Sequence, residues 1–457
     1  MPERGELGDW LGANEIKSVR LIATNHDGLA LGKHVAPAKF LSAAERGFQL
    51  ADTAFGVDFT GDVALGWDWG EWRGEVLDVV VVPDLSTLVV DPATPGLASV
   101  LCDFLTGRRD PVPVCGRGML RRLAGELTAQ GLEAKVAPEI EFSVFEEPIQ
   151  VARERGYRDL TPLGGPGRIT YLLSRSPDFA EFMSAVAERL DALAVGWESW
   201  SAETACGQAE INIAPIDPLS AADHVARTKL VLREVAGELG RSVTFMALAD
   251  AHLGASLHLN LSVLRDGVNQ FYSDSGLAQA PLLRSWAAGL LATLPGAMSI
   301  FSPTVNSYRR LVEIAGPPTT VTWGEANKST AVRTVTHDPG SARIEHRVPA
   351  IDCNPYLALA AILAGGLIGM AAGLEPPEQF EQMAWGLEPD AAPRIPDSIT
   401  KAADALEADE RLSAVLGPDA VEYWVGSRRW EWLTFHRAGG DPDQVTDYEL
   451  ARYFEHV

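Results

Sequence analysis

The segment APEIEFSVF, residues 137–145, places two acidic side chains inside an otherwise apolar run. Glu139 and Glu141 are two positions apart among residues that favour a β-strand, which we predict over 135–145. Side chains two apart on a strand point to the same face, about 6–7 Å from each other. Two carboxylates at that distance in a core element repel each other, so this strand requires a source of positive charge nearby.

Three further segments of the chain also have the pattern of a strand with one polar face. The segment SLHLNLSVL, residues 256–264, alternates strictly between apolar and polar residues. The segment 208–214 contains Glu210 and follows Glu203. The polar positions of 256–264 are Ser256, His258, Asn260 and Ser262. One side of 342–348 carries Arg343, Glu345 and Arg347.

A single alternating strand usually has a solvated outer face. Four such strands in one domain, carrying Glu, His, Asn and Arg, instead favour a shared pocket with several carboxylates and one imidazole. Divalent cations relieve the repulsion in such a pocket, and carboxylates with a single His and no thiolate suit Mg²⁺ or Mn²⁺ better than zinc. Six protein ligands are too many for one Mg²⁺ that keeps its waters, so we expect two or more ions.

Arg343 and Arg347 lie beside these carboxylates and predict an anionic substrate, because guanidinium groups match phosphate and carboxylate oxygens. Two ions with neighbouring arginines indicate phosphoryl transfer from a nucleotide. The chain has no GxxxxGKS/T loop, no GxGxxG turn and no GxSxG elbow, which argues against a P-loop, a dinucleotide-binding fold and a serine hydrolase of that type. The metals and arginines must therefore hold the nucleotide.

The chain of 457 residues is long enough for two domains. Short strand-like runs at 18–25 and 76–92 precede a passage rich in turn residues at 107–118. Beyond that passage, longer helical patterns separate isolated strands. We therefore expect an N-terminal domain over residues 1–112 and a larger domain over residues 113–457.

The net charge of −24 argues against nucleic-acid and anionic-membrane partners. The four cysteines are widely spaced and predict free thiols in a reducing compartment. The apolar run at 356–374 contains paired glycines and has no companion span, which favours a buried helix over a membrane span. We therefore expect a cytoplasmic protein.

The tryptophan-rich segment 66–72 is predicted to be a packing or subunit-contact cluster.

Five motifs together resemble the glutamine synthetase family in their order and approximate spacing. They are EIEF at 139–142, GQAE at the end of 203–210, LHLNLS at 257–262, NSYRRL at 306–311 and RIEHRVP at 343–349. The resemblance implies an α+β fold, with a β-grasp N-terminal domain and a catalytic domain whose curved antiparallel sheet is flanked by helices. It also implies a homo-oligomer, a dodecamer of two hexameric rings with active sites between neighbouring subunits.

The resemblance further implies a role for each matching residue. One ion would be bound by Glu141, Glu203 and Glu210, and a second by Glu139, His258 and Glu345. The glutamate substrate would contact Arg310, Arg347, Gly254 and Glu141. ATP would contact Ser262, Asn260, Lys328, Arg333 and Arg343, with Lys328, Arg333 and Arg347 as the catalytic cations and Lys328 standing where the family usually has Arg.

The sequence departs from the family where ammonium would bind. A glutamate that closes the family's active site should lie six residues after Arg310, but this position is Gly316. Glu313 could replace it only in a remodelled loop. The aspartate that helps the family to bind ammonium has two candidates here, Asp58 and Asp62. Loss of a carboxylate and gain of volume at Gly316 favour a bulkier amine over ammonium.

The sequence therefore predicts an ATP-dependent ligase that joins the γ-carboxylate of glutamate to an organic amine through a γ-glutamyl phosphate, as in amine catabolism and nitrogen metabolism. Three alternatives remain open at this point. The chain could be a true glutamine synthetase with a remodelled flap, a ligase that uses another acid, or a catalytically inactive binding or structural protein on the same scaffold.

Overall fold

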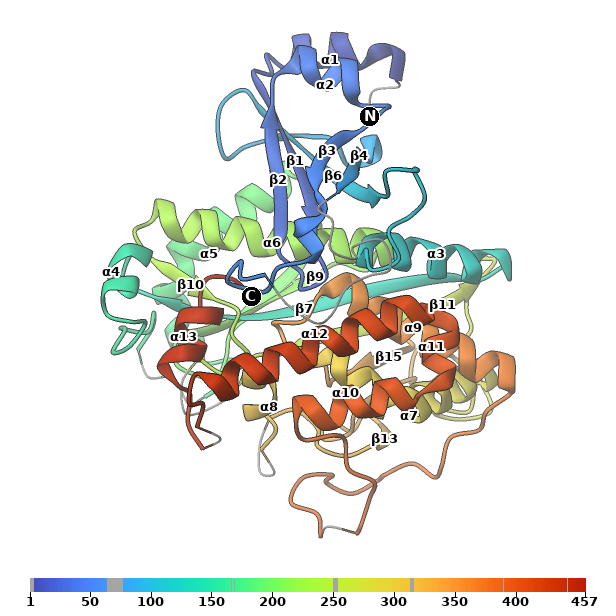
Figure 1. The fold of residues 1–457 in the computed structure, drawn as a ribbon. Helices are drawn as coiled ribbons and strands as arrows, with labels where there is room; N and C mark the ends of the chain where they lie inside the picture. The colour runs from blue at the N-terminus through green and yellow to red at the C-terminus, as the bar shows by residue number, and fades with distance from the viewer. Residues whose placement is uncertain are drawn as a thin grey trace.

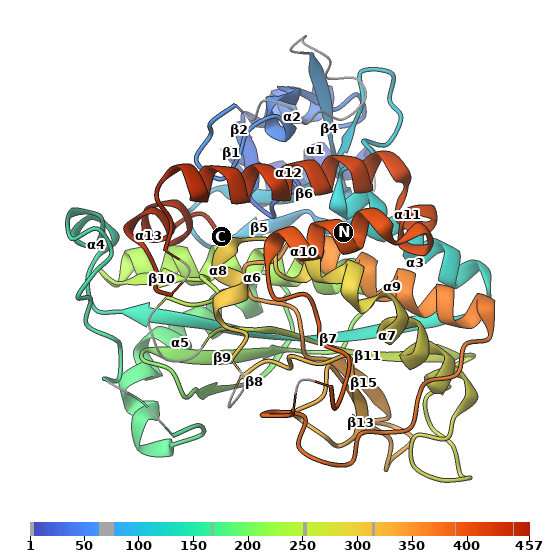
Figure 2. The same cartoon turned by 60° about the horizontal axis from the view of Figure 1, so that its bottom comes forward.

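The computed structural model of the chain describes residues 4–63, 77–165, 167, 169–249, 254–312, 316–388, 390–441 and 443–457. The tryptophan-rich segment 66–72 and Glu313 lie outside these residues. The described chain forms two sheets, of six and nine strands, with the smaller sheet on top of the helices that cover the larger one (Figures 1 and 2).

The smaller sheet is built from the first part of the chain and has its own apolar core, with Val19, Phe40, Phe55 and Phe104 among its buried members. Its strand order is β2-β1-β6-β4-β3, with β5 paired to β6. Strands β1 and β6 are parallel, and the other pairs are antiparallel. The elements are α1 Leu7–Ala13, β1 Ser18–Thr24, β2 Ala30–Val35, α2 Pro37–Ala43, β3 Phe48–Ala51, β4 Asp78–Pro83, β5 Val89–Asp91 and β6 Leu97–Leu105. The β-grasp assignment and the boundary at residue 112 stay predictions.

The larger sheet contains all four strands that were predicted to carry a polar face. Its order is β13-β14-β15-β11-β7-β9-β8, with β10 paired to β7 and β12 paired to β11. All of its pairs are antiparallel except β13 with β14. The strands are β7 Glu133–Phe145, β8 Trp197–Ala202, β9 Gln208–Ile213, β10 Ser242–Thr244, β11 Leu257–Arg265, β12 Val268–Asn269, β13 Trp323–Glu325, β14 Val332–Val335 and β15 Arg343–His346.

Helices cover one face of the larger sheet because alternate residues of its strands are apolar (Figure 2). In β7, Val136, Ile140, Phe142 and Val144 are fully buried on that face, in line with the period of two read from the sequence. The α+β fold class is confirmed. The helices are α3 Gly116–Ala129, α4 Ile149–Glu154, α5 Ser176–Ala192, α6 Pro218–Glu238, α7 Pro281–Phe301, α8 Val305–Arg309, α9 Pro355–Ala372, α10 Ile399–Ala408, α11 Glu410–Leu416, α12 Pro418–Arg437 and α13 Asp447–Tyr453.

Helix α9 corresponds to the apolar run that was predicted to be a buried helix. Among the described residues it is the one helix long and apolar enough to cross a membrane, but 78% of it is buried inside the protein. It packs against α7, α3 and α6. A Cβ added to Gly366 would lie 2.0 Å from the Trp286 ring of α7, so the paired glycines serve close helix packing. The apolar length of α9 therefore fills the core.

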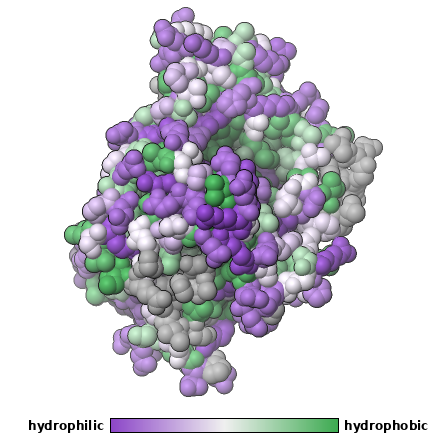
Figure 3. All heavy atoms as spheres, turned by 90° about the vertical axis from the view of Figure 1, so that its left-hand side faces the viewer, coloured by the Kyte–Doolittle hydropathy of each residue, from purple (hydrophilic) through white to green (hydrophobic). Residues whose placement is uncertain are grey.

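Polar side chains dominate the face of the molecule drawn in Figure 3, where apolar residues form only small separate patches. The four cysteines are free thiols, three of them buried. Most of the described Asp and Glu residues are exposed or half-buried, and a minority, such as Asp27, Asp223 and Glu449, are buried.

Candidate active site

The strand register brings the predicted polar residues together on the sheet face opposite the core helices. His258 of β11 lies directly across from Glu139 of β7, and Glu210 of β9 lies across from Glu141. On the other side of β11, Glu345 pairs with Asn260. Paired residues of neighbouring strands share a face and lie about 4.5–5.5 Å apart at Cβ. The four polar faces predicted from the sequence thus form one continuous surface.

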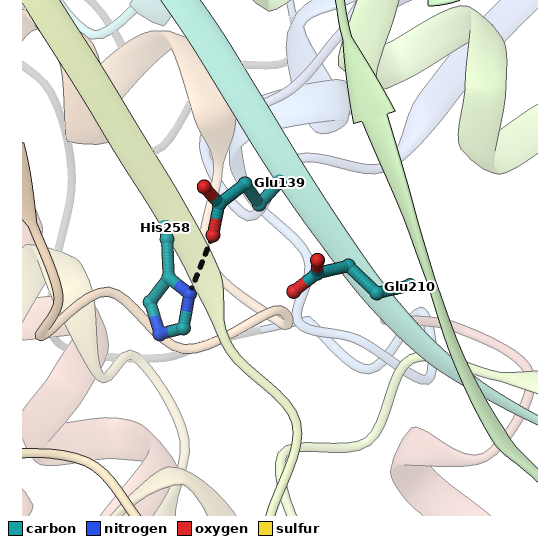
Figure 4. A group of neighbouring side chains, drawn as sticks. All are labelled: Glu139, Glu210 and His258. Carbon is teal, nitrogen blue, oxygen red and sulfur yellow. Dashed lines mark hydrogen bonds and ion pairs between the residues drawn. The ribbon is translucent and has the colours of Figure 1, made fainter. Parts of the chain in front are cut away.

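Glu139, Glu210 and His258 make up a compact group that could hold a metal ion (Figure 4). One ligand atom of each lies within 4.8 Å of the others. Nδ1 of His258 is 3.0 Å from Oε2 of Glu139, and this carboxylate accepts the hydrogen bond. The group combines Glu210 from the first predicted ligand set with Glu139 and His258 from the second, so the two sets adjoin each other.

Glu141, Glu203 and Glu345, the other predicted ligands, have different partners. The Oε2 atom of Glu141 accepts hydrogen bonds from the backbone N–H of Ser256 at 2.7 Å and from Gln208 Nε2 at 3.1 Å. Glu203 accepts a bond of 3.3 Å from Ser201. Glu345 is buried between two arginines, Arg333 and Arg347, and pairs with both.

The crowding of carboxylates shifts their acidities in opposite directions. Burial, together with the negative charges of Glu139 and Glu141, raises the pKa of Glu210 to about 9. Burial and Glu141 raise the pKa of Glu203 to about 7. Burial alone would also raise the pKa of Glu139, but the hydrogen bond and charge of His258 outweigh it and lower the value to about 2. Glu203 and Glu210 are therefore the two carboxyl groups whose ionisation is most disfavoured in the absence of a cation.

These residues fit a hard divalent cation. The donors are carboxylate oxygens and one imidazole, a set that Mg²⁺ and Mn²⁺ accept. A cation among Glu139, Glu210 and His258 would offset the burial and the like-charge repulsion that together raise the pKa of Glu210. Two observations thus support a divalent cation here: the ligand atoms are oxygens and one imidazole nitrogen, and the crowded carboxylates require a positive charge between them.

Metal binding is expected to release protons, because the ligands must be deprotonated. At pH 7.5 the metal-free protein holds a proton on Glu210, whose pKa is about 9 in the fold and 4.5 ordinarily. Since the folded state then binds more protons than the unfolded chain, the stability of the metal-free protein falls as the pH rises between these values. Saturating Mg²⁺ should flatten this decline.

Calorimetric titration with MnCl₂ in buffers of different ionisation enthalpy measures the proton release directly. Thermal unfolding from pH 5 to pH 9, with and without Mg²⁺, measures the change in pH dependence. Equal binding heats in all buffers would contradict the expected protonation of Glu210.

A cavity of about 760 Å³ adjoins the metal group along β7, β11 and β15. Glu139 and three of the predicted nucleotide ligands, Asn260, Ser262 and Arg343, line it. Two other predicted nucleotide ligands are not in this lining: Arg333 pairs with Glu345, and Lys328 is exposed, with its carbonyl oxygen accepting a bond of 2.8 Å from Arg347 Nε.

A second cavity of about 630 Å³ contains two predicted glutamate contacts, Gly254 and Arg310, in its wall. Arg310 is 1% exposed, and its guanidinium donates to Ser256 Oγ at 3.2 Å and to the Val348 carbonyl. Burial lowers the pKa of Arg310 to about 10, so the side chain remains charged at neutral pH. Gly254 is connected to the carboxylates, because its carbonyl accepts a bond from Gln208 Nε2.

The position that departs from the family is Gly316, whose φ is +118°. Among the described residues, an added Cβ would meet nothing closer than the Arg310 carbonyl oxygen at 3.7 Å. These residues leave room for a side chain, although the backbone conformation disfavours any residue but glycine.

The two candidate amine-binding aspartates differ in their surroundings. Asp58 is buried and accepts from Trp430 at 3.1 Å and from Arg452 at 2.9 Å. Arg452 also pairs with buried Glu431. Asp62 is exposed and lies in the same turn. Within one chain the structure thus connects Asp58 to α12 and α13, and does not bring it to the carboxylates of the larger sheet.

Sequence reasoning did not single out Gln208 and Tyr171. Gln208 bridges Glu141 and Gly254. Burial and the negative charges of Glu203, Glu210 and Glu139 raise the pKa of Tyr171, whose φ is +63°. Gln208 could have been found from its position in the GQAE motif. Tyr171 is in a loop without regular periodicity, and only the tertiary structure places it near the carboxylates.

Comparison with known proteins agrees with this geometry. The family model described as glutamine synthetase, catalytic domain, matches residues 113–453. The chain belongs to the glutamine synthetase family. Family membership makes it an ATP-dependent carbon–nitrogen ligase, as the motifs indicated.

Its relatives include enzymes with different amine substrates. The chain is 29% identical to a glutamate–isopropylamine ligase of a Pseudomonas species over 98% of its own length and 97% of the relative's. It is 30% identical to a γ-glutamylethanolamide synthetase of Streptomyces coelicolor, with coverage of 99% and 96%. It is 31% identical to the glutamine synthetase of Mycobacterium tuberculosis, with 96% of each chain covered. A solved structure of GmaS without ligand superposes with a TM-score of 0.83 at 27% identity, over 97% of this chain and 98% of GmaS.

Proposed function

We propose that this protein joins the γ-carboxylate of glutamate to an organic amine, with ATP as the second substrate and Mg²⁺ or Mn²⁺ as the metal. The observations that carry the proposal are the group of Glu139, Glu210 and His258, which could hold a metal ion, and the glycine, Gly316, at the position of the family's flap glutamate. The first feature supports phosphoryl transfer from ATP, and the second removes the carboxylate that the family uses with ammonium.

The phosphoryl-transfer half of the reaction is assigned to the larger sheet. We assign the predicted ligands Glu139, Glu141, Glu203, Glu210, His258 and Glu345 to two or more ions. The ions would supply charge stabilisation for the transferred phosphoryl group. Arg343, which lines the larger cavity, would hold phosphate oxygens, and Arg333 and Arg347 would neutralise charge that develops on the acyl phosphate.

The acid and the amine are assigned to the smaller cavity. Arg310 and Gly254 would orient glutamate so that its γ-carboxylate faces the bound nucleotide. The amine would then attack the γ-glutamyl phosphate, and phosphate would leave. Phe145, Leu160 and Val312 contribute apolar surface to the cavity wall, which suits an amine with a carbon chain. The named amine ligases among the relatives support this choice, but the chain is as similar to glutamine synthetases.

A substrate panel tests the proposal. ADP release is measured with glutamate, MgATP and, in turn, ammonium, methylamine, isopropylamine, ethanolamine and a polyamine, and the γ-glutamyl amide is identified by mass spectrometry. We expect at least one organic amine to exceed ammonium in kcat/KM. Robust turnover with ammonium and none with the organic amines would establish the alternative, a glutamine synthetase with a remodelled flap.

The catalytically inactive alternative is disfavoured because all six predicted metal positions keep residues that can bind a metal. The alternative that the enzyme uses another acid instead of glutamate is tested by the same assay with aspartate and other dicarboxylates.

For assembly and location we propose a cytoplasmic dodecamer of two hexameric rings, by analogy with the family. Multi-angle light scattering of the purified protein tests the assembly.

The Gly316→Glu variant should shift selectivity away from organic amines. The new carboxylate would occupy the open space beside Arg310, so kcat/KM for the preferred organic amine should fall by roughly tenfold or more, and kcat/KM for ammonium should fall less. The Gly316→Ala variant is the matched control, because it has the same unfavourable φ without the carboxylate. Equal losses in both variants, for every amine, would show that backbone strain alone explains the effect.

A further inference from the structure

Asn260 lies between a predicted metal ligand and a predicted phosphate ligand, and bonds to both. Its Nδ2 donates to Glu139 Oε1 at 2.9 Å and to the Ala137 carbonyl at 3.2 Å. Its Oδ1 accepts from Arg343 Nε at 2.9 Å. The side chain is 6% exposed on β11, a strand in the middle of the larger sheet. Both ends of the amide are therefore engaged by the protein itself.

The orientation of this amide follows from the chemistry of its neighbours. An ionised carboxylate can only accept hydrogen bonds, and a guanidinium can only donate them. The Nδ2 end must therefore face Glu139 and the Oδ1 end must face Arg343, as observed. An apolar residue of the same shape could satisfy neither group, and leaving either partner of a buried charged hydrogen bond unpaired is costly.

We propose that Asn260 is a positioning residue that holds Glu139 in place for the metal and Arg343 in place for the nucleotide phosphates. It thereby links ion binding to nucleotide binding through one side chain. This inference rests on the proposed function, and it differs from the sequence-based prediction that Asn260 itself contacts ATP. Arg343 uses Nε on Asn260 and Nη1 on the Ser341 carbonyl at 3.1 Å, so its Nη2 atom can face the cavity that both residues line.

The Asn260→Leu variant tests this role, because leucine has nearly the shape of asparagine but no polar atoms. Mn²⁺ affinity is measured by calorimetry on the metal-free protein, and ADP affinity is measured at saturating Mn²⁺. We expect Mn²⁺ affinity to fall by roughly 10- to 100-fold, as for other residues that orient metal ligands, and ADP affinity to fall as well. In the background of Arg343→Met, Asn260→Leu should cause little further loss of ADP affinity, because the two residues act on the phosphates through the same guanidinium.

Asn269→Leu is the matched control. Asn269 lines the same cavity, but among the described residues its side chain bonds to the Ala342 carbonyl at 2.7 Å and to the Phe271 N–H at 3.0 Å, and to no charged group. It should leave Mn²⁺ affinity within about twofold of wild type. If Asn260→Leu does not fold, Asn260→Ser takes its place, since serine is too short to bridge both charged groups.

Two results separate this inference from the proposed function. Wild-type affinities in a folded Asn260 variant, with a wild-type protein that binds Mn²⁺ and ADP normally, would overturn the positioning role alone. A wild-type protein that binds neither Mn²⁺ nor ADP would overturn the proposed function and this inference with it.

Discussion

The Glu139→Gln variant is expected to lose metal-dependent nucleotide binding while it keeps its fold. Glu139 is in the group with Glu210 and His258, and it lines the larger cavity. Glutamine preserves the shape of the side chain and one acceptor oxygen but removes the charge that binds a cation. We expect Mn²⁺ affinity to fall by roughly 100-fold or more, beyond the usual cost of losing a residue that only orients a ligand, and ADP affinity to fall with it.

Calorimetry with MnCl₂ and thermal unfolding with and without MgADP measure this effect. A ligand that binds only the native state raises the unfolding temperature, so the shift caused by MgADP should disappear in the variant. Glu133→Gln is the matched control, because Glu133 is an exposed glutamate at the start of the same strand. An unchanged shift in Glu139→Gln would place the metal elsewhere.

The Arg310→Met variant is expected to bind glutamate poorly without losing metal affinity. Arg310 is a buried cation in the wall of the smaller cavity, and its Nε has no hydrogen-bond partner among the described residues. Loss of a charged hydrogen bond costs about 1.5–3 kcal/mol, so KM for glutamate should rise by roughly 10- to 100-fold. Steady-state kinetics with varied glutamate measure the change, and Mn²⁺ titration should give the wild-type affinity.

The neighbouring arginine offers a sharp contrast. Arg309 donates to the fully buried carboxylate of Glu449 at 2.6 and 2.8 Å. Arg309→Met would leave that charge without its cation, which costs about 3–5 kcal/mol of folding stability. We therefore expect a lower unfolding temperature but a nearly normal KM for glutamate in the folded fraction. A rise in this KM equal to that of Arg310→Met would contradict the assignment of Arg310 to the substrate.

The strands that carry the candidate site could be predicted because their pattern is local. Alternation of apolar and polar residues identified the segments of β7 and β11 to within two residues at each end. One face of each strand had to be buried under helices, so the opposite face had to carry the charged residues. Helix α9 was predictable for a similar reason, since its small and apolar residues suit only a crowded interior.

The partners of these residues could not be predicted in the same way. Asp58 is close to the family's aspartate in sequence order, yet its carboxylate is bonded to Trp430, 372 positions later in the chain, and to Arg452. Asn260 was predicted to contact ATP, yet its amide is bonded to Glu139 and Arg343. Such contacts depend on which elements pack together, and no local pattern contains that information.

The sequence by itself determined where the four strands with a polar face lie, which face of each carries the charged residues, and that so many carboxylates on one surface require divalent cations. Only the tertiary structure decided how these charges are grouped, because strand register sets which side chains face each other. Register placed Glu210 across from Glu141 and His258 across from Glu139. The resulting crowding raises the pKa of Glu210 to about 9, which makes its environment the strongest electrostatic argument for a bound cation.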